Sequence, residues 1–139
     1  MASKKAEPAA LELVLQSISE RRYLSVEYTT MLRDGAKITR RRLWLVSHVF
    51  EARNGLCVVA FDSYRKSVRT FRLDRASNIE LGDKAPAPKV AEGMVLIYPA
   101  TYQARRAKPY QVKADSAEKY LAKGWAAEPV VGVLAYEAS

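Results

Sequence analysis

The residues most able to do chemistry in this sequence are cations gathered in one short stretch, residues 64–75. These twelve residues include five basic side chains and a single acidic one, Asp74, which gives a net charge of +4. The basic residues are Arg65, Lys66, Arg69, Arg72 and Arg75. Because arginine grips carboxylate and phosphate groups through two parallel hydrogen bonds, this density predicts an anion-binding surface. Tyr64, beside the cations, offers a ring on which a nucleic-acid base could stack.

The rest of the side-chain inventory disfavours an enzyme. The sequence has one histidine and one cysteine, and it contains no HExxH, GxSxG, P-loop or CxxC pattern. His48 lies among apolar neighbours of a predicted strand, where a lone histidine is more often structural than a general base. Because the acidic residues are scattered singly, they form no pair for glycosidase or two-metal chemistry. We therefore expect a recognition protein with no catalytic residues, no metal and no cofactor.

Two apolar runs predict that the basic stretch belongs to a β-hairpin. The first run extends from Leu56 to Phe61 and ends at Asp62 and Ser63, residues that favour turns. The second run resumes at Ser67. The turn between the two runs therefore holds the first two cations of the stretch, and the second strand leads through the other three.

Alternation along that second strand divides its cations between two faces of the sheet, because successive side chains of a strand point in opposite directions. Phe71 and Leu73 are expected in the core, with Arg69 and Arg75 at the two ends of the same row. Arg72 is expected on the opposite face, so its replacement by alanine is predicted to weaken anion binding without unfolding the protein. An edge strand kept soluble by its charges is the alternative interpretation.

The string from Asp62 to Arg75 resembles the closing signature of WYL domains, Sm-like barrels of bacteria that are usually attached to transcription regulators. That signature has a small turn, Arg, three residues, Arg, and then x-Phe-Arg-Leu-Asp-Arg-Ile, and this chain departs from it only at Ala76. The three letters that name the family fall at Leu56-Cys57-Val58, so the aromatic pair is absent although apolar character remains. Val46 stands where a proline is usual, and the resemblance covers roughly residues 11–81.

The resemblance implies a regulatory or ligand-sensing module with a site at the signature arginines. These are Arg65, Arg69, Arg72 and Arg75. The residues themselves add three candidates for the same site, Tyr64, Tyr28 and Arg42, whereas Trp44 and Phe71 are expected in the core. We expect a non-enzymatic module that binds single-stranded DNA or RNA, or a nucleotide-like ligand, through the arginine-rich hairpin. The alternative is a protein-interaction module of plasmid, phage or defence-system origin whose basic face docks on an acidic partner.

Hydrophobic periodicity predicts a helix and five strands ahead of residue 84. The helix begins at Pro8 and carries apolar residues at helical spacing. The strands are expected at 23–30, 37–50, 56–61, from 67 onward, and at 77–81. This order is typical of a five-stranded Sm-like or SH3-like antiparallel barrel, so we expect a mainly β protein with some α structure (α+β). The second strand contains three consecutive cations, residues 40–42, which predict an exposed strand end or a bulge.

Domain organisation follows from a change of composition after residue 84. We expect a flexible N-terminus at 1–8, the barrel at 9–84, a linker at 85–93, and a small αβ extension at 94–139. The extension is predicted to pack on the barrel or on a partner subunit, which leaves a homodimer open. Within it we expect strands at 94–98, 110–113 and 129–136, and a helix capped by Asp115 or Ser116 that ends at Gly124.

Charge and hydropathy set the remaining expectations. The 139 residues carry a formal net charge of +8, which favours polyanionic partners. Residues 1–84 hold 16 basic and 10 acidic side chains, or +6, so most of the charge belongs to the predicted barrel. No apolar run is long enough for a signal peptide or a membrane span, so we expect a cytoplasmic protein that does not bind membranes. Cys57, inside an apolar strand, is predicted to be a buried thiol.

Overall fold

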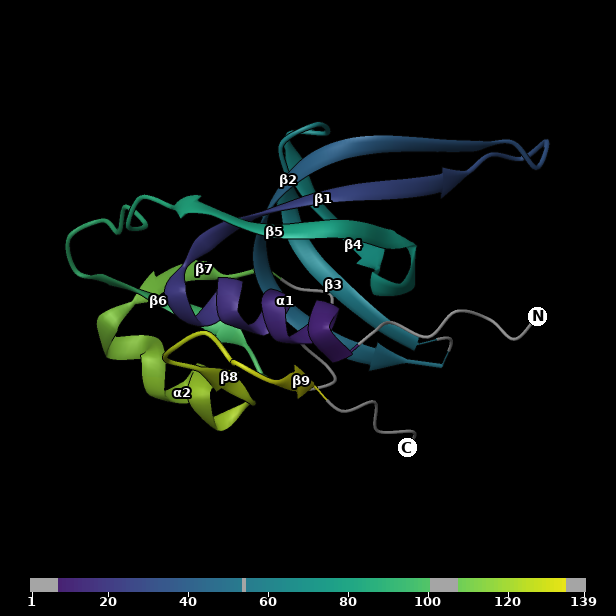
Figure 1. Ribbon diagram of the computed structural model, residues 1–139. Coiled ribbons are helices and arrows are strands. Elements are labelled where there is room, and N and C mark those ends of the chain that lie inside the picture. Colours follow the sequence, from purple (N-terminus) through teal and green to yellow (C-terminus); the bar gives the residue numbers. More distant parts are fainter. Residues whose placement is uncertain (1–7, 54, 101–107, 135–139) are drawn as a thin grey trace.

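The computed structural model describes residues 8–53, 55–100 and 108–134 (Figure 1). Its first part contains α1 (Pro8–Glu20), β1 (Arg22–Met31), β2 (Lys37–Ala52), β3 (Gly55–Asp62), β4 (Ser67–Arg72), the 3₁₀ helix η1 (Leu73–Arg75) and β5 (Ala76–Lys84). Its second part contains β6 (Met94–Pro99), β7 (Tyr110–Lys113), η3 (Ala114–Ser116), α2 (Ala117–Ala122), β8 (Trp125–Ala126) and β9 (Val133–Leu134). The predicted helix and five strands are confirmed, and so is the mainly β class with antiparallel sheets.

The first sheet has the strand order β4-β3-β2-β1-β5, and all of these neighbours are antiparallel. β1 and β2 form a long two-stranded ribbon that projects beyond the rest of the molecule (Figure 1). Its tip is the predicted Asp-Gly turn, in which Asp34 Oδ1 accepts the Ala36 N–H at 2.9 Å and Gly35 has φ +86°. In the described part of the chain no ladder joins β4 to β5, and η1 makes that connection instead.

The main core lies between this sheet and α1, which contributes Val14 and Ile18. Its centre is aromatic: the Trp44 and Phe71 rings stack with centroids 4.5 Å apart, and Tyr28 meets Phe71 edge-on at 4.9 Å. Trp44, Phe71 and Leu73 are all buried, as the sequence predicted. Burial of rings of this size is a major source of stability and fixes the inner face of the sheet.

A β-bulge in the middle of β2 changes which side chains face the core. Val46 pairs with Ala60 and His48 with Val59, so Ser47 is the extra residue. His48 is fully buried, and its Nδ1 lies 2.8 Å from Ser47 Oγ. Cys57, in contrast, is half-buried rather than buried; it lies on the face of β3 opposite the main core and packs at the border of a second core cluster.

The C-terminal part forms a second sheet with the order β7-β6-β8 and then returns to the first sheet. β9 pairs in parallel with β2, at Val49 and Phe50, and Leu134 packs with Phe50 and Val59 in a second core cluster. The predicted strand at 129–136 is therefore much shorter within the described residues. α2 ends before Gly124 as predicted, with φ +100° there. Ser116 is at the N-cap position of α2 but its side chain makes no capping bond, and Asp115 lies in η3.

Two further predictions concern a flexible N-terminus at 1–8 and a linker at 85–93. Residues 1–7, 101–107 and 135–139 fall outside the described part of the chain. Residues 85–93 contain no helix or strand. Among the described ranges, no helix has both the length and the apolar character that a membrane span requires.

Candidate functional site

The turn between β3 and β4 is built on Asp62, the last residue of β3. Asp62 accepts the N–H of Arg65 on Oδ2 at 3.0 Å and the N–H of Lys66 on its carbonyl oxygen at 2.7 Å. Lys66 closes the turn with a left-handed backbone, φ +55°. Ser63 binds the turn to β2, because its N–H donates to the Leu43 carbonyl and its Oγ accepts the Leu43 N–H. These bonds give the turn a defined conformation on the sheet.

Beneath the turn lies an ion pair without access to solvent. Arg42 Nη1 and Asp62 Oδ2 are 2.7 Å apart, and their side chains are 5% and 0% exposed. The same Oδ2 also receives the Arg65 N–H, so one buried oxygen links β2, β3 and the turn. Removing one partner of such a pair leaves an uncompensated buried charge, which is strongly destabilising. The sequence predicted an exposed strand end or a bulge at the three consecutive cations; Arg40 and Arg41 are exposed, whereas the burial of Arg42 differs from this prediction.

Above the ion pair, Tyr64 is surrounded by guanidinium groups. The Cζ atoms of Arg40, Arg42 and Arg65 lie 4.7, 5.1 and 5.8 Å from the centre of its ring. Tyr64 remains 49% exposed, and both Arg40 and Arg65 are exposed. The result is a half-exposed aromatic ring with three guanidinium groups over it, those of Arg40 and Arg65 exposed and that of Arg42 buried.

Four of the seven predicted site residues meet here, namely Tyr64, Arg65, Arg42 and Tyr28. Arg42 lies over the ring of Tyr28 as well, with Cζ 5.6 Å from its centre. Tyr28 is only 6% exposed, and its hydroxyl accepts the N–H of Arg72 at 3.0 Å. Tyr28 and Arg42 therefore support the site from below, and Tyr64 and Arg65 form its surface. Arg69 lies on the same face of β4 as Phe71, is exposed, and donates from Nε to Ser67 Oγ at 3.0 Å.

The structure places the other two predicted residues elsewhere. Arg72 lies on the outer face of β4, as alternation predicted, and forms an ion pair with Asp74 through bonds of 2.7 and 3.2 Å. This carboxylate raises the pKa of Arg72 above its usual value. Arg75 was expected in line with Arg69, but β4 ends at residue 72 and η1 turns the chain. Arg75 instead lines a groove beside α1.

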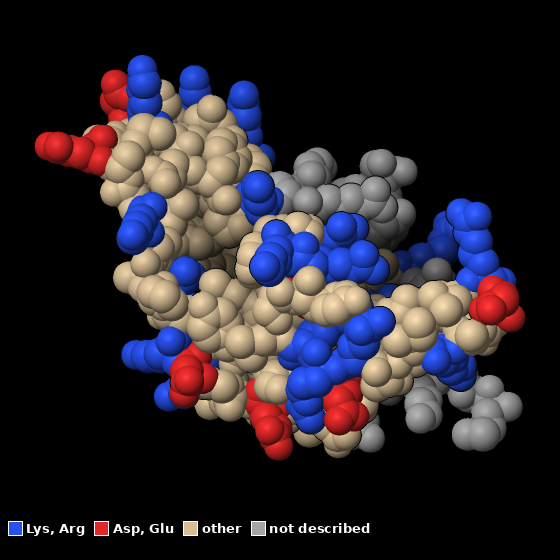
Figure 2. Space-filling model, turned by 90° about the horizontal axis from the view of Figure 1, so that it is seen from above, with Lys and Arg blue, Asp and Glu red and all other residues tan. Residues whose placement is uncertain are grey.

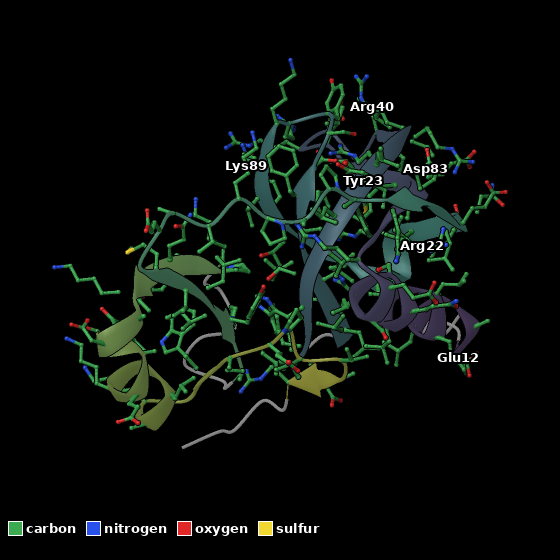
Figure 3. All side chains as sticks on the ribbon, turned by 90° about the vertical axis from the view of Figure 1, so that its left-hand side faces the viewer. Glu12, Arg22, Tyr23, Arg40, Asp83 and Lys89 are labelled. Atoms are coloured by element: carbon green, nitrogen blue, oxygen red, sulfur yellow. The ribbon has the colours of Figure 1, made fainter. Side chains whose placement is uncertain are left out.

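Arg40 belongs to the site although the sequence did not single it out. The feature that reveals its role is the register of the ribbon, in which Tyr28 pairs with Arg40 and Val26 with Arg42. The two arginines therefore lie on the same face of the ribbon. Arg41 points to the other face and bonds to Glu27 and Ser25. Figure 2 shows Lys and Arg side chains gathered at the centre of the upper face. In Figure 3, Arg40 points outward at the top of the molecule, well away from Glu12 of α1.

Comparison with known proteins identifies the family. Residues 9–81 match the WYL domain, and because this is more than half of the 139 residues, the chain belongs to the WYL-domain family. Among solved structures it is similar to proteasome accessory factor B/C (PafBC) of Arthrobacter aurescens, with a TM-score of 0.51 and 18% sequence identity. That similarity covers 64% of this chain but only 14% of the PafBC chain, and it establishes the fold alone. No curated protein matches the chain.

Proposed function

We propose that this chain is a non-enzymatic regulatory module that binds single-stranded nucleic acid, or a nucleotide-like anion, at the turn between β3 and β4. The observation that carries the proposal is the exposed ring of Tyr64 with three guanidinium groups within 6 Å of its centre. A base stacks on the exposed ring, and the phosphates on either side of it pair with Arg40, Arg65 and Arg69.

The geometry favours a single strand over a duplex. A base is free to stack on a protein side chain only when it is unstacked from its own neighbours. The site itself offers a ring and charges, which suit contacts to base faces and phosphates. We therefore expect weak sequence preference and binding that depends strongly on salt.

Fluorescence anisotropy with short labelled DNA and RNA single strands, measured across a range of salt concentrations, tests the proposal. Each neutralised phosphate contributes a slope of about −0.7 to the dependence of log K on log salt. Tyr64→Ala is expected to lower affinity about tenfold, since stacking of one base contributes roughly 1–3 kcal/mol. Arg53→Gln is the matched control, because Arg53 is also exposed but lies beyond the opposite end of β3. A flat salt response, or no binding at low salt, refutes the proposal.

One observation favours a second candidate, a module that docks on an acidic protein. The outer face of the sheet beside the basic turn exposes Phe61 and Val68, which are 43% and 36% accessible and are cross-strand partners. Nucleic-acid binding at Tyr64 does not require these apolar side chains. Mass-spectrometric identification of copurifying molecules with and without nuclease separates the two candidates, because a protein partner survives the nuclease, a nucleic-acid strand does not, and a nucleotide-like anion is identified by its mass.

A further inference from the structure

A groove with a volume of about 920 Å³ runs between α1, the β1–β2 ribbon and the start of β5. We call it the α1 groove. Its volume lies in the range of small-molecule sites, roughly 300–1,000 Å³. The residues that define it here are Leu13, Thr29, Lys37, Leu73, Arg75 and Ile79.

The α1 groove is separate from the site at Tyr64. Thr29 and Thr39, whose hydroxyl oxygens are 2.7 Å apart, line the groove from one face of the ribbon. Because alternate residues face opposite ways, Arg40 points to the other face, where it meets Tyr64. The ribbon therefore stands between the two sites, and a ligand in the groove does not occupy the ring of Tyr64.

The walls of the groove combine apolar surface with unbalanced positive charge. Leu73 belongs to the main core, and Leu13 and Ile79 pack against that core while remaining partly exposed. The only acidic residue in the lining, Asp74, is already bound by Arg72 at 2.7 Å. Within the described ranges, no ion pair involves Arg75 or Lys37. The lining thus presents two cations that no described acid neutralises.

From this arrangement we propose that the α1 groove binds a small amphipathic anion, a molecule with a carboxylate or sulfonate head and an aromatic or aliphatic body. The head lies at Arg75 and Lys37, because no acid among the described residues pairs with either cation. The body covers Leu13 and Ile79, which are partly exposed, and so removes their apolar surface from water. A phosphodiester chain makes poorer use of this groove, since every unit of it is charged and the floor is apolar.

The probe 8-anilinonaphthalene-1-sulfonate tests the proposal by its fluorescence, and N-phenyl-1-naphthylamine, which has the same rings without the sulfonate, is the matched neutral probe. The folded protein is expected to bind the sulfonate saturably and more tightly than the neutral probe. Arg75→Gln and Lys37→Gln are each expected to weaken sulfonate binding about tenfold and to leave the neutral probe unchanged, as for the loss of one charge-assisted hydrogen bond. Ser77→Glu, which places an acid in the same lining, should weaken the sulfonate further.

Arg53→Gln is again the control, and thermal melting of every variant verifies that the probes report a folded protein. Equal binding of the two probes, no saturable binding of the sulfonate, or unchanged sulfonate binding by the Arg75→Gln/Lys37→Gln double variant overturns the proposal. Oligonucleotide binding by the same variants, measured by fluorescence anisotropy, distinguishes a failure of this proposal from a failure of the proposed function. Arg75→Gln should leave oligonucleotide affinity unchanged, and Tyr64→Ala should leave sulfonate binding unchanged.

Discussion

Replacement of Asp62 by alanine removes the carboxylate that pairs with the buried guanidinium of Arg42. The Arg42 side chain is 5% exposed, so in the variant its charge stays buried without a partner. Breaking a buried pair in this way costs about 3–5 kcal/mol. The N–H of Arg65 loses its side-chain acceptor as well, which adds about 1 kcal/mol. A domain is usually stable by about 5–15 kcal/mol in total, so the variant should be close to unfolding.

Denaturant unfolding at 25 °C, followed by circular dichroism, measures this loss of free energy. The matched control is Glu27→Ala, which removes the acid of the exposed pair Arg41–Glu27 on neighbouring strands. Because the side chains of that pair are 47% and 36% exposed, the control should lose no more than about 1 kcal/mol. The contrast compares the loss of a buried ion pair with the loss of an exposed one, and each variant also removes one further acceptor, that of the Arg65 N–H or that of Asn78 Nδ2.

A double variant, Arg42→Met with Asp62→Val, separates stability from function. It removes both charges, and replacing a buried ion pair with apolar residues is often neutral. Stability should therefore recover to within about 1–2 kcal/mol of the parent. Oligonucleotide affinity should stay reduced, because the turn still lacks its acceptor at Asp62 and Tyr64 lacks the guanidinium beneath it. If Asp62→Ala loses no more stability than Glu27→Ala, Arg42 reaches water in solution and the reasoning fails.

Other predictions follow from placement. Arg72→Ala should lower the free energy of unfolding by no more than about 1 kcal/mol, because its ion pair with Asp74 is partly exposed. It should leave oligonucleotide affinity unchanged; a loss of affinity in anisotropy would show that Arg72 belongs to the anion-binding site, as the sequence predicted. Phe71→Ala should lose about 3–5 kcal/mol through a core cavity, measured by denaturant unfolding. A chain of residues 1–84 should fold with a lower melting temperature, since it lacks β9 beside β2; an unfolded spectrum would show that the two parts form one unit. Hydrogen bonds from Gln16 and Arg22 lower the pKa of Glu20. The ionised Glu20 therefore stabilises the fold above the pKa that it has in the unfolded chain, and this stabilisation should be lost as the pH falls through its pKa in the folded protein. The melting temperature of Glu20→Gln, measured against pH, should lack this part of the acid dependence.

Most of the elements could be predicted because their patterns are local. Alternation placed Phe71 and Trp44 in the core, and the first helix and strands appear at the expected positions. The path of the chain after β4 could not be predicted from alternation, because η1 interrupts the two-residue repeat of the strand and carries Arg75 away from Arg69. The short β9 depends on contacts with Phe50 and Val59, which lie about 75 to 85 residues earlier in the sequence.

The sequence predicted the type of the candidate site, a ring beside cations, but not all the residues that form it. Tyr64 and Arg65 were recognised from their types, since a ring beside cations is visible in the sequence alone. The roles of Arg40 and Arg42 depend on the register of the ribbon, which the sequence pattern did not fix. Asp62 was read only as a turn residue, because nothing local shows that its carboxylate faces a buried arginine on another strand.

The shared oxygen of Asp62 also has a consequence for how this sequence can change over time. A single substitution at either position 42 or position 62 leaves one charge without its counterpart inside the protein, and the intermediate is penalised even when the final pair would be acceptable. Positions 42 and 62 are therefore expected to change together among relatives or to remain fixed together. The identity of the surface ring at position 64 is free of that constraint, so selection can retune what the turn recognises without disturbing what holds it in place.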